Sequence, residues 1–490
     1  MERTLGTTCI ATGRLTLSPA WALTLGLLAL VLLRLTLLDD YLAYSGDMAS
    51  YLMTRNYLLG ADPTGYMEAH WRPPIVGALL VPLTWAFGDL LGSKLLALLS
   101  SVVVAGGFYA FARIWLRPWW AVAAAWAFAL HPMVADYTVG GYLPLLALAL
   151  TLLALRWLHD ALHRQRPLWL PAIAVFLLVG LNQTAPPIWA LAALLMVAET
   201  PGARRRGLLA LGLAVLVSLA WYYPFYSNGV PLSGSPMTSP NMGLLVPQVS
   251  PTRLLNGLIG VGAIALMPVQ LRYRALPAGL FLATSLMGAA DIALNNVLAR
   301  TGQMVVVYGV VGVAVALQGW SDRLRLSWPR TVQGAGLAGL ALMALFLSSL
   351  AWSHQFHFYA TRGDTLTPDR LATVRWIGDS TPWTARVYAH PRGLGYYIGG
   401  LAPRAWDAPF PVPLVGREAQ HAAYRCALGW DAGCNPYSLR DDYGVDYIAL
   451  DESAWEQIAD TPADGWPRTA TSPWLRLEHE EGPVKVYGWQ

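Results

Sequence analysis

A polar loop separates the first two apolar segments of this chain, and its residues 39–74 are DDYLAYSGDMASYLMTRNYLLGADPTGYMEAHWRPP. The loop combines several carboxylates with one histidine and two arginines, whereas the segments on both sides are apolar. Acidic side chains beside hydrocarbon cost several kcal/mol of free energy unless they face water or a ligand. The loop is therefore a candidate functional site next to a membrane.

The composition is that of a membrane protein. Of the 490 residues, 55% are hydrophobic and only 13% are charged, and the mean hydropathy is +0.42. Soluble domains carry about 25% charged residues. The sequence has no Gly-rich phosphate loop, no Cys/His metal cluster and no basic patch with interleaved aromatic residues, so we expect no nucleic-acid partner.

Eleven apolar segments approach the length of a transmembrane helix, which is roughly 17–25 residues. They are residues 16–38, 93–116, 119–135, 141–158, 168–182, 186–199, 207–226, 254–271, 275–292, 302–319 and 331–352. The first is too long for the apolar part of a signal peptide, so we expect it to remain as a span. Residues 74–88 are apolar but fewer, with Pro82 inside, and we predict a juxtamembrane or re-entrant helix there.

The arginines decide the predicted orientation of these spans. If residues 74–88 do not cross and the N-terminus is cytoplasmic, every arginine cluster lies on the cytoplasmic side, as the positive-inside rule requires. The clusters are Arg113 and Arg117, Arg156, Arg164 and Arg166, Arg204 to Arg206, Arg272 and Arg274, and Arg323, Arg325 and Arg330. The sequence therefore predicts a polytopic α-helical protein of the plasma membrane, in contact with membrane lipids, with loops 39–94 and 227–253 and the C-terminus outside. Loop 227–253 is either a lid over a substrate or a plain mobile loop.

The composition changes to that of a water-soluble domain near residue 354. This divides the chain into a transmembrane domain, 1–353, and an external domain, 354–490. Within the external domain, residues 367–379 have helical spacing, with Thr367 as the N-cap. We expect short strands and a terminal hairpin, and hence a small α/β domain, from residues 386–389, 446–450, 474–479 and 484–489.

The oxidation state of the cysteines depends on the cell compartment that this domain faces. With only three of them the chain has no disulfide framework. Cys426 and Cys434 either form a disulfide, if the domain faces an oxidising compartment, or remain two thiols.

Asp47 is the first candidate for chemistry. It lies a few residues beyond the first span, and residues 48–52 are predicted to begin an amphipathic helix. A carboxylate at a helix N-terminus is held ionised by the helix dipole, and an ionised carboxylate at a partly desolvated surface suits a general base that takes a proton from an acceptor hydroxyl. The alternative is that Asp47 only caps the helix.

Other side chains on the same predicted face extend this candidate site. Asp136 is either a second acid or metal ligand, or a solvated turn residue. Arg72, Lys94 and Arg300 are isolated basic residues near the predicted outer surface. Each of them either binds a lipid phosphate or anchors the chain at the membrane interface.

The loop resembles the first external loop of the GT-C superfamily of membrane glycosyltransferases. The similar elements are Gly46-Asp47-Met48-Ala49-Ser50-Tyr51, Asn56-Tyr57-Leu58-Leu59-Gly60, His70-Trp71-Arg72-Pro73-Pro74, Phe87-Gly88, Gly92-Ser93-Lys94 and His131-Pro132. A body of about 11 transmembrane helices with a small external C-terminal α/β domain is a common plan in this superfamily, so the resemblance extends loosely over the whole chain.

The resemblance implies an enzyme that transfers a sugar from a polyprenyl-phosphate-linked donor, with inversion, at the external membrane face. Asp47 is then the catalytic carboxylate, with Asp136 as a second candidate. The donor phosphate is bound by basic side chains, for which the candidates are Arg72, His70, Lys94 and Arg300. The acceptor is a protein, a lipid or a polysaccharide. The resemblance requires no cofactor and leaves open a divalent metal, Mg²⁺ or Mn²⁺.

Two departures from the superfamily pattern keep other functions open. Met48 stands where many relatives have Glu, and residues 140–144 (GGYLP) stand where many have an aspartate. A non-catalytic GT-C-like scaffold or accessory subunit is therefore the first alternative. A lipid or sugar transporter is the second, although transporters usually hold ionisable groups near the bilayer midplane and the predicted spans carry almost none.

Overall fold

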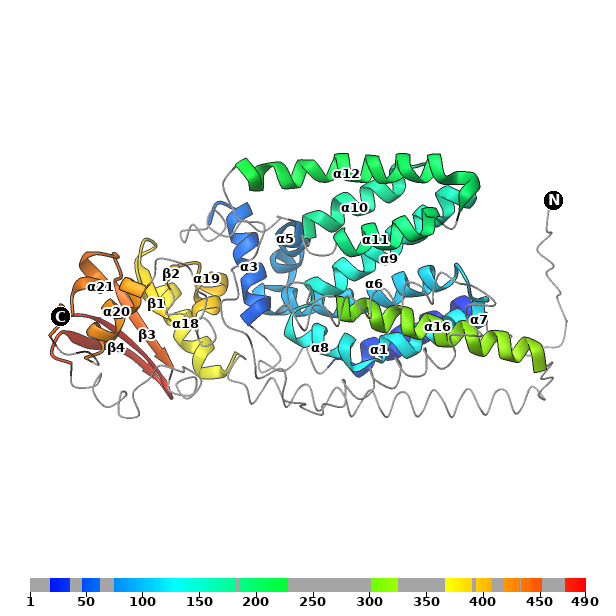
Figure 1. Cartoon of the computed structure of the whole chain (residues 1–490). Coiled ribbons are helices and arrows are strands. Elements are labelled where there is room, and N and C mark those ends of the chain that lie inside the picture. Colours follow the sequence, from blue (N-terminus) through cyan, green and yellow to red (C-terminus); the bar gives the residue numbers. More distant parts are fainter. Residues whose placement is uncertain are drawn as a thin grey trace.

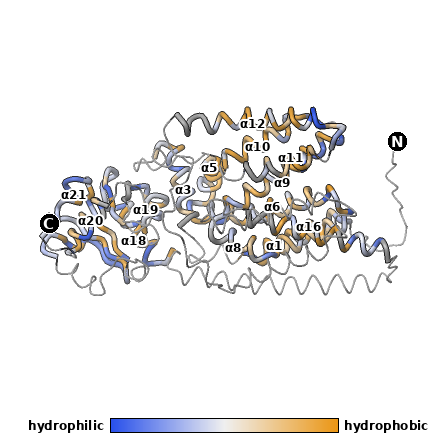
Figure 2. Tube along the Cα trace, in the orientation of Figure 1, coloured by the Kyte–Doolittle hydropathy of each residue, from blue (hydrophilic) through white to orange (hydrophobic). Residues whose placement is uncertain are grey.

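The computed structural model describes residues 18–35, 46–61, 75–164, 166–181, 186–198, 200–227, 301–324, 366–389, 394–407, 418–429, 431, 433–451 and 472–490. The described residues form a body of helices and a smaller unit that contains a β-sheet, which lie end to end (Figure 1). We call the first the helical body and the second, from residue 366 onward, the C-terminal unit. Hydrophobic residues dominate the helical body, whereas hydrophilic residues cover much of the C-terminal unit (Figure 2).

The helical body consists of helices that pack against one another, most of them apolar. They are α1 (Pro19–Leu33), α3 (Gly46–Leu58), α5 (Ile75–Phe87), α6 (Asp89–Ala112), α7 (Pro118–Ala129), α8 (Pro132–Gly140), α9 (Leu143–His163), α10 (Trp169–Leu181), α11 (Pro186–Ala198), α12 (Arg204–Ser227) and α16 (Thr301–Leu324). Helices α6 and α9 cross closely, because Gly107 of α6 has no Cβ to separate it from the backbone of Ala149. Among the described residues, α6 and α9 are the two helices long and apolar enough to cross a membrane by length and composition.

One predicted span is not a single helix. Residues 119–135 divide into the end of α7, at Ala129, and the start of α8, at Pro132. Proline has no N–H and its ring clashes with the preceding turn, so a helix cannot run through it undisturbed. The His131 Nδ1 accepts a hydrogen bond from the Met133 N–H at 3.1 Å, and this bond caps the new helix. Residues 254–271, 275–292 and 331–352, like nearly all of loop 227–253, lie outside the described residues, so the number of spans stays a prediction.

The C-terminal unit is built on a five-stranded mixed sheet in the order β2-β1-β3-β5-β4. Its elements are α18 (Pro368–Ser380), β1 (Arg386–Ala389), α19 (Tyr396–Leu401), β2 (Ala405–Asp407), α20 (Glu418–Ala427), α21 (Ser438–Asp441), β3 (Tyr447–Asp451), β4 (Leu475–Glu481) and β5 (Val484–Trp489). Strand β1 is parallel to β2 and β3, whereas β5 is antiparallel to β3 and β4. Thr367 caps α18 by accepting the Arg370 N–H, so the predicted helix, its cap, the two short strands and the terminal hairpin are confirmed.

The apolar core of this unit continues into the helical body. Successive residues of a strand face opposite sides of the sheet. In β1, Tyr388 joins the core with α20, whereas Val387 joins the core with α18 and α19. That second core also contains Leu52 of α3 and Val76 of α5. The two parts of the molecule therefore share one hydrophobic core.

The structure resolves the open question of the two cysteines. Cys426, on α20, is bonded to Cys434, and the two Cα atoms are 6.0 Å apart. A bridge across eight residues removes conformational entropy from the unfolded chain, and the loop-closure relation gives about 2–3 kcal/mol for such a loop.

We expect Cys434→Ser to lower the free energy of unfolding of the C-terminal unit by about 2–3 kcal/mol. Thermal unfolding of the purified chain, followed by the near-ultraviolet signal with and without reductant, measures this change. Adding reductant should shift the wild type and leave the variant unchanged. Equal shifts in both proteins would contradict the bond.

Candidate functional site

Helix α3 carries the predicted catalytic carboxylate. The helix runs from Gly46 to Leu58, so the backbone of Asp47 lies inside its first turn and not at the cap position. Free amide groups and the positive end of the helix dipole favour a negative charge in that turn. The prediction of a helix that starts here is confirmed, and the role of Asp47 stays a prediction.

The expectation that this helix is amphipathic is wrong. Every residue from Met48 to Asn56 is at most 8% exposed, on all sides of the helix. An amphipathic surface helix would expose a polar face. Helix α3 is covered instead because α5 packs against one side of it and α19 of the C-terminal unit against another (Figure 1).

Helix α3 also contacts α6 and α8, which carry the predicted site residues Lys94 and Asp136. It contacts the start of α9 as well, where the rings of Tyr51 and Tyr142 lie edge to face with centroids 4.9 Å apart. Met48 shares one core cluster with Ala135 of α8 and Leu96 of α6. The structure thus brings the segments that hold Asp47, Asp136 and Lys94 together.

The structure describes the backbone of some predicted site residues, the side chain of others, and neither for the rest. Asp136 has its backbone in the middle of α8. Lys94 lies in the second turn of α6 and is 3% exposed, so its side chain is inside the protein. His70, Arg72 and Arg300 lie outside the described residues. The roles of all these residues stay predictions.

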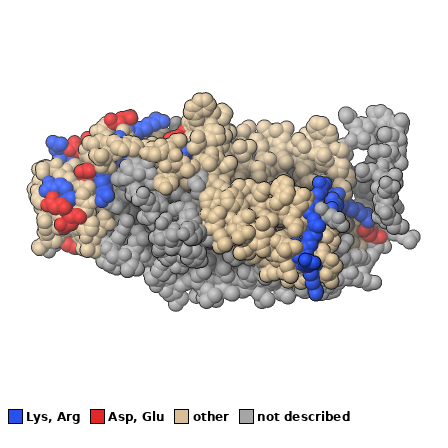
Figure 3. Space-filling view, turned by 90° about the horizontal axis from the view of Figure 1, so that it is seen from above, with Lys and Arg blue, Asp and Glu red and all other residues tan. Residues whose placement is uncertain are grey.

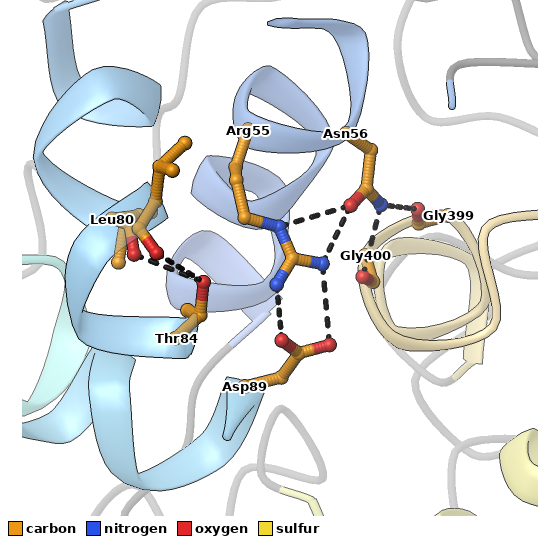
Figure 4. A network of polar contacts seen from close by, with 8 residues as sticks. Arg55, Asn56, Leu80, Thr84, Asp89, Gly399 and Gly400 are labelled. Atoms are coloured by element: carbon orange, nitrogen blue, oxygen red, sulfur yellow. Dashed lines mark hydrogen bonds and ion pairs between the residues drawn. The ribbon is translucent and has the colours of Figure 1, made fainter. Parts of the chain in front are cut away.

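A polar network beside α3 was not predicted from the sequence (Figure 4). The Arg55 guanidinium forms an ion pair with Asp89, in which Nη2 is 3.2 Å from Oδ2. The same guanidinium donates to the Oδ1 of Asn56 from Nε at 3.1 Å and from Nη2 at 2.6 Å. The Asn56 Nδ2 donates in turn to the carbonyl oxygens of Gly399 and Gly400, at 3.0 and 3.1 Å.

A weak signal for part of this network is present in the sequence. Arg55 is an isolated arginine on the predicted outer face, and Asp89 follows Gly88 at the start of an apolar helix. Gly88 has φ +78°, a conformation that favours glycine, and this turn sets Asp89 in the first turn of α6. Lone opposite charges beside apolar helices pair because an unpaired buried charge is costly.

A divalent metal needs several carboxylate, imidazole or thiolate ligands close together. Over the described residues, no group of three His, Cys, Asp or Glu side chains lies together. Met48, which directly follows Asp47, is 0% exposed and belongs to a hydrophobic core cluster. The described part of the chain therefore offers no set of ligands that fits a divalent metal.

Basic side chains gather at the end of the helical body away from the C-terminal unit, where they form a stripe (Figure 3). Helix α12 begins at that end with Arg204, Arg205 and Arg206 (Figure 1). The predicted topology requires this separation, because the arginines are assigned to one side of the membrane and the C-terminal unit to the other.

Comparison with known proteins gives similarity in structure alone. No protein-family model matches the sequence, and no curated protein matches it. The chain is similar to the oligosaccharyltransferase of Archaeoglobus fulgidus tethered with an acceptor peptide, with TM-score 0.59 and 14% identity over 89% of this chain and 69% of that one. It is similar to ArnT from Cupriavidus metallidurans bound to undecaprenyl phosphate, with TM-score 0.56 and 14% identity over 96% and 98% of the two chains. It is also similar to the arabinofuranosyltransferase AftD from Mycobacteria, with TM-score 0.60 and 19% identity over 96% of this chain and 42% of that one.

Proposed function

We propose that this protein, which has the fold of the GT-C superfamily of membrane glycosyltransferases, is itself a glycosyltransferase. It transfers a sugar from a polyprenyl-phosphate-linked donor to an acceptor hydroxyl or amide at the external membrane face, with inversion. The observation that carries the proposal is the fold shared with transferases of three kinds, one of them bound to undecaprenyl phosphate. The position of Asp47 in the first turn of α3, beside α6 and α8, supports it.

The proposed reaction follows from the chemistry of these residues. The Asp47 carboxylate takes the proton of the acceptor, whose oxygen or nitrogen attacks the anomeric carbon from the face opposite the phosphate. The bond between the anomeric carbon and the phosphate oxygen breaks, and its electron pair leaves with the polyprenyl phosphate. Attack from the opposite face inverts the configuration. Asp136 is a second proposed carboxylate.

The leaving phosphate needs positive charge near it. Charge that develops on a leaving oxygen is stabilised by fixed cations in a site that excludes water. Lys94 is the one proposed phosphate ligand whose side chain the structure describes, and it is buried. His70, Arg72 and Arg300 complete the proposed set. A divalent metal, Mg²⁺ or Mn²⁺, would require ligands beyond the described residues, and no step is assigned to it.

The donor class can be tested without knowing the sugar. Undecaprenyl phosphate is compared with undecaprenol, which lacks the phosphate, as a stabiliser of the purified protein in detergent. A ligand at about 100 times its Kd stabilises a protein by about 2.7 kcal/mol. The proposal predicts a clearly higher melting temperature with undecaprenyl phosphate than with undecaprenol. Equal melting temperatures would contradict a site for polyprenyl phosphate.

Lys94→Met is expected to remove the preference for undecaprenyl phosphate over undecaprenol. The methionine keeps most of the apolar stem but carries no charge for the phosphate. Lys485→Met is the matched control, because Lys485 is the only other lysine of the chain and pairs with Glu480 on the sheet. The control should keep the full preference. A Lys94→Met protein that still distinguishes the two lipids would remove Lys94 from the proposed site.

A further inference from the structure

We propose that the C-terminal unit positions the first turn of α3 through a contact that we call the α3–α19 latch, made by Asn56, Gly400 and the backbone of Ala49. Asn56 and Gly400 are then positioning residues for Asp47. The structural part of this proposal stands on contacts alone. Its catalytic part rests on the proposed function.

The first observation is the complete pairing of the Asn56 side chain. Its amide nitrogen donates to two backbone carbonyls of α19, and its oxygen accepts from the Arg55 guanidinium (Figure 4). Asn56 is 3% exposed, so each of these bonds is shielded from water. A buried amide that lost its partners would cost about 1–3 kcal/mol. The network therefore holds α3 and α19 in one arrangement.

The second observation is the close approach of the two backbones. A Cβ on Gly400 would lie 2.4 Å from the carbonyl oxygen and 3.1 Å from the carbonyl carbon of Ala49. Only glycine fits at such a distance from backbone. Ala49 is two residues after Asp47, so Gly400 contacts the helix directly beside its first turn.

The opposite side of α3 is held in the same way. A Cβ on Gly77 of α5 would lie 2.8 Å from the carbonyl carbon of Thr54. Arg55 pairs with Asp89 at the start of α6. Helix α3 is thus fixed between the helical body on one side and α19 on the other, and moving either partner moves the helix that carries Asp47.

The third observation ties α19 to the rest of the C-terminal unit. The Arg404 Nη2 donates to the carbonyl oxygens of Gly378 and Thr381, at 2.6 and 3.0 Å, and Nη1 donates to that of Ala402 at 3.1 Å. Burial lowers the pKa of this guanidinium and the Asp379 carboxylate opposes the shift. Ile398 of α19 packs in the core shared with α18. The short helix therefore moves with the whole unit.

In the proposed reaction, the C-terminal unit keeps Asp47 in position to take the proton of the acceptor. A general base must lie within hydrogen-bond reach of the proton that it removes. A displacement of about 1 Å at such a group can cost on the order of 100-fold in rate. A loosened latch should therefore lower kcat and leave the affinity for the donor unchanged, because the proposed phosphate ligand Lys94 lies on α6 and not on α3.

Hydrogen exchange of the full-length protein tests the latch. We compare Gly400→Ala with Gly378→Ala, a control on α18 of the same unit whose added Cβ would meet the Ala402 Cβ at an ordinary 3.5 Å. Gly400→Ala should raise the exchange rate of the amides in residues 46–58 by about 10-fold or more, because the helix opens more easily. Exchange in β3 and β5 should stay unchanged in both variants. Asn56→Ala is a second variant that removes the hydrogen bonds without adding bulk, and it should act in the same direction.

Unchanged exchange of residues 46–58 in both Gly400→Ala and Asn56→Ala would overturn the latch. If exchange rises, kinetics with the identified donor decide the catalytic part: kcat should fall about 10–100-fold with the donor KM unchanged. A rise in exchange with an unchanged kcat would overturn the positioning role. If the wild type turns over no donor, the proposed function fails, and the exchange result still establishes or removes the latch.

Discussion

Asp47→Asn is expected to lower the rate of sugar transfer by about 10²–10⁴-fold, the usual contribution of a positioned general base. Asparagine has nearly the same shape as aspartate but cannot accept the acceptor proton. The backbone position in the first turn of α3 can also hold the amide, so the fold should be kept. Consumption of a radiolabelled donor in proteoliposomes measures the change.

The matched control is Asp442→Asn, an exposed aspartate just after α21 in the C-terminal unit. It should retain the wild-type rate and the wild-type yield of folded protein. Full activity of Asp47→Asn would remove Asp47 from its proposed role. Equal loss in both variants would show that the assay reports damage to the protein and not the loss of a base.

The largest expected change in stability is for Asp451→Ala, at about 3–5 kcal/mol. Arg370 of α18 and Asp451 of β3 form a buried ion pair with Nε 2.5 Å from Oδ2, and their side chains are 1% and 3% exposed. Removing the carboxylate takes a counter-charge away from a buried guanidinium. Unfolding of the purified chain by denaturant, followed by tryptophan fluorescence, measures the loss.

The control for this prediction removes an ion pair of the same type at the surface. Arg440 and Asp441 pair at 2.8 Å, but their side chains are 41% and 50% exposed. Solvent screens such a pair, and exposed pairs contribute about 0–1 kcal/mol. Asp441→Ala should therefore change the free energy of unfolding by less than about 1 kcal/mol. Similar losses in the two variants would show that burial does not decide the effect of losing the carboxylate.

Local signals in the sequence were enough to predict much of the C-terminal unit. Thr367 before Pro368 marks a helix start whatever surrounds it, and the structure has the cap and the helix there. The terminal hairpin follows equally from alternation on both sides of a turn. The break at Pro132 was missed because a proline does not end every helix: α5 continues through Pro82, whereas α7 ends before Pro132.

The surroundings of α3 could not be predicted from local sequence. Asn56 and its partners on α19 are more than 340 residues apart in the chain. Helix α19 has only six residues, and its glycines show no pattern that points to α3. The amphipathic interpretation of α3 failed for the same reason, because the helix is covered by a distant part of the chain. Long-range packing of this kind overrides local pattern.

The most direct test of the proposed glycosyltransferase activity is donor consumption by the wild-type protein in sealed proteoliposomes, with a panel of radiolabelled polyprenyl-phosphate sugars and an acceptor fraction. We predict that one donor is consumed, with release of polyprenyl phosphate in equal amount to the sugar transferred. Consumption of no donor by protein that hydrogen exchange shows to be folded would contradict this activity and favour a non-catalytic scaffold of this fold. Movement of intact donor across the bilayer without transfer would contradict it in favour of a transporter.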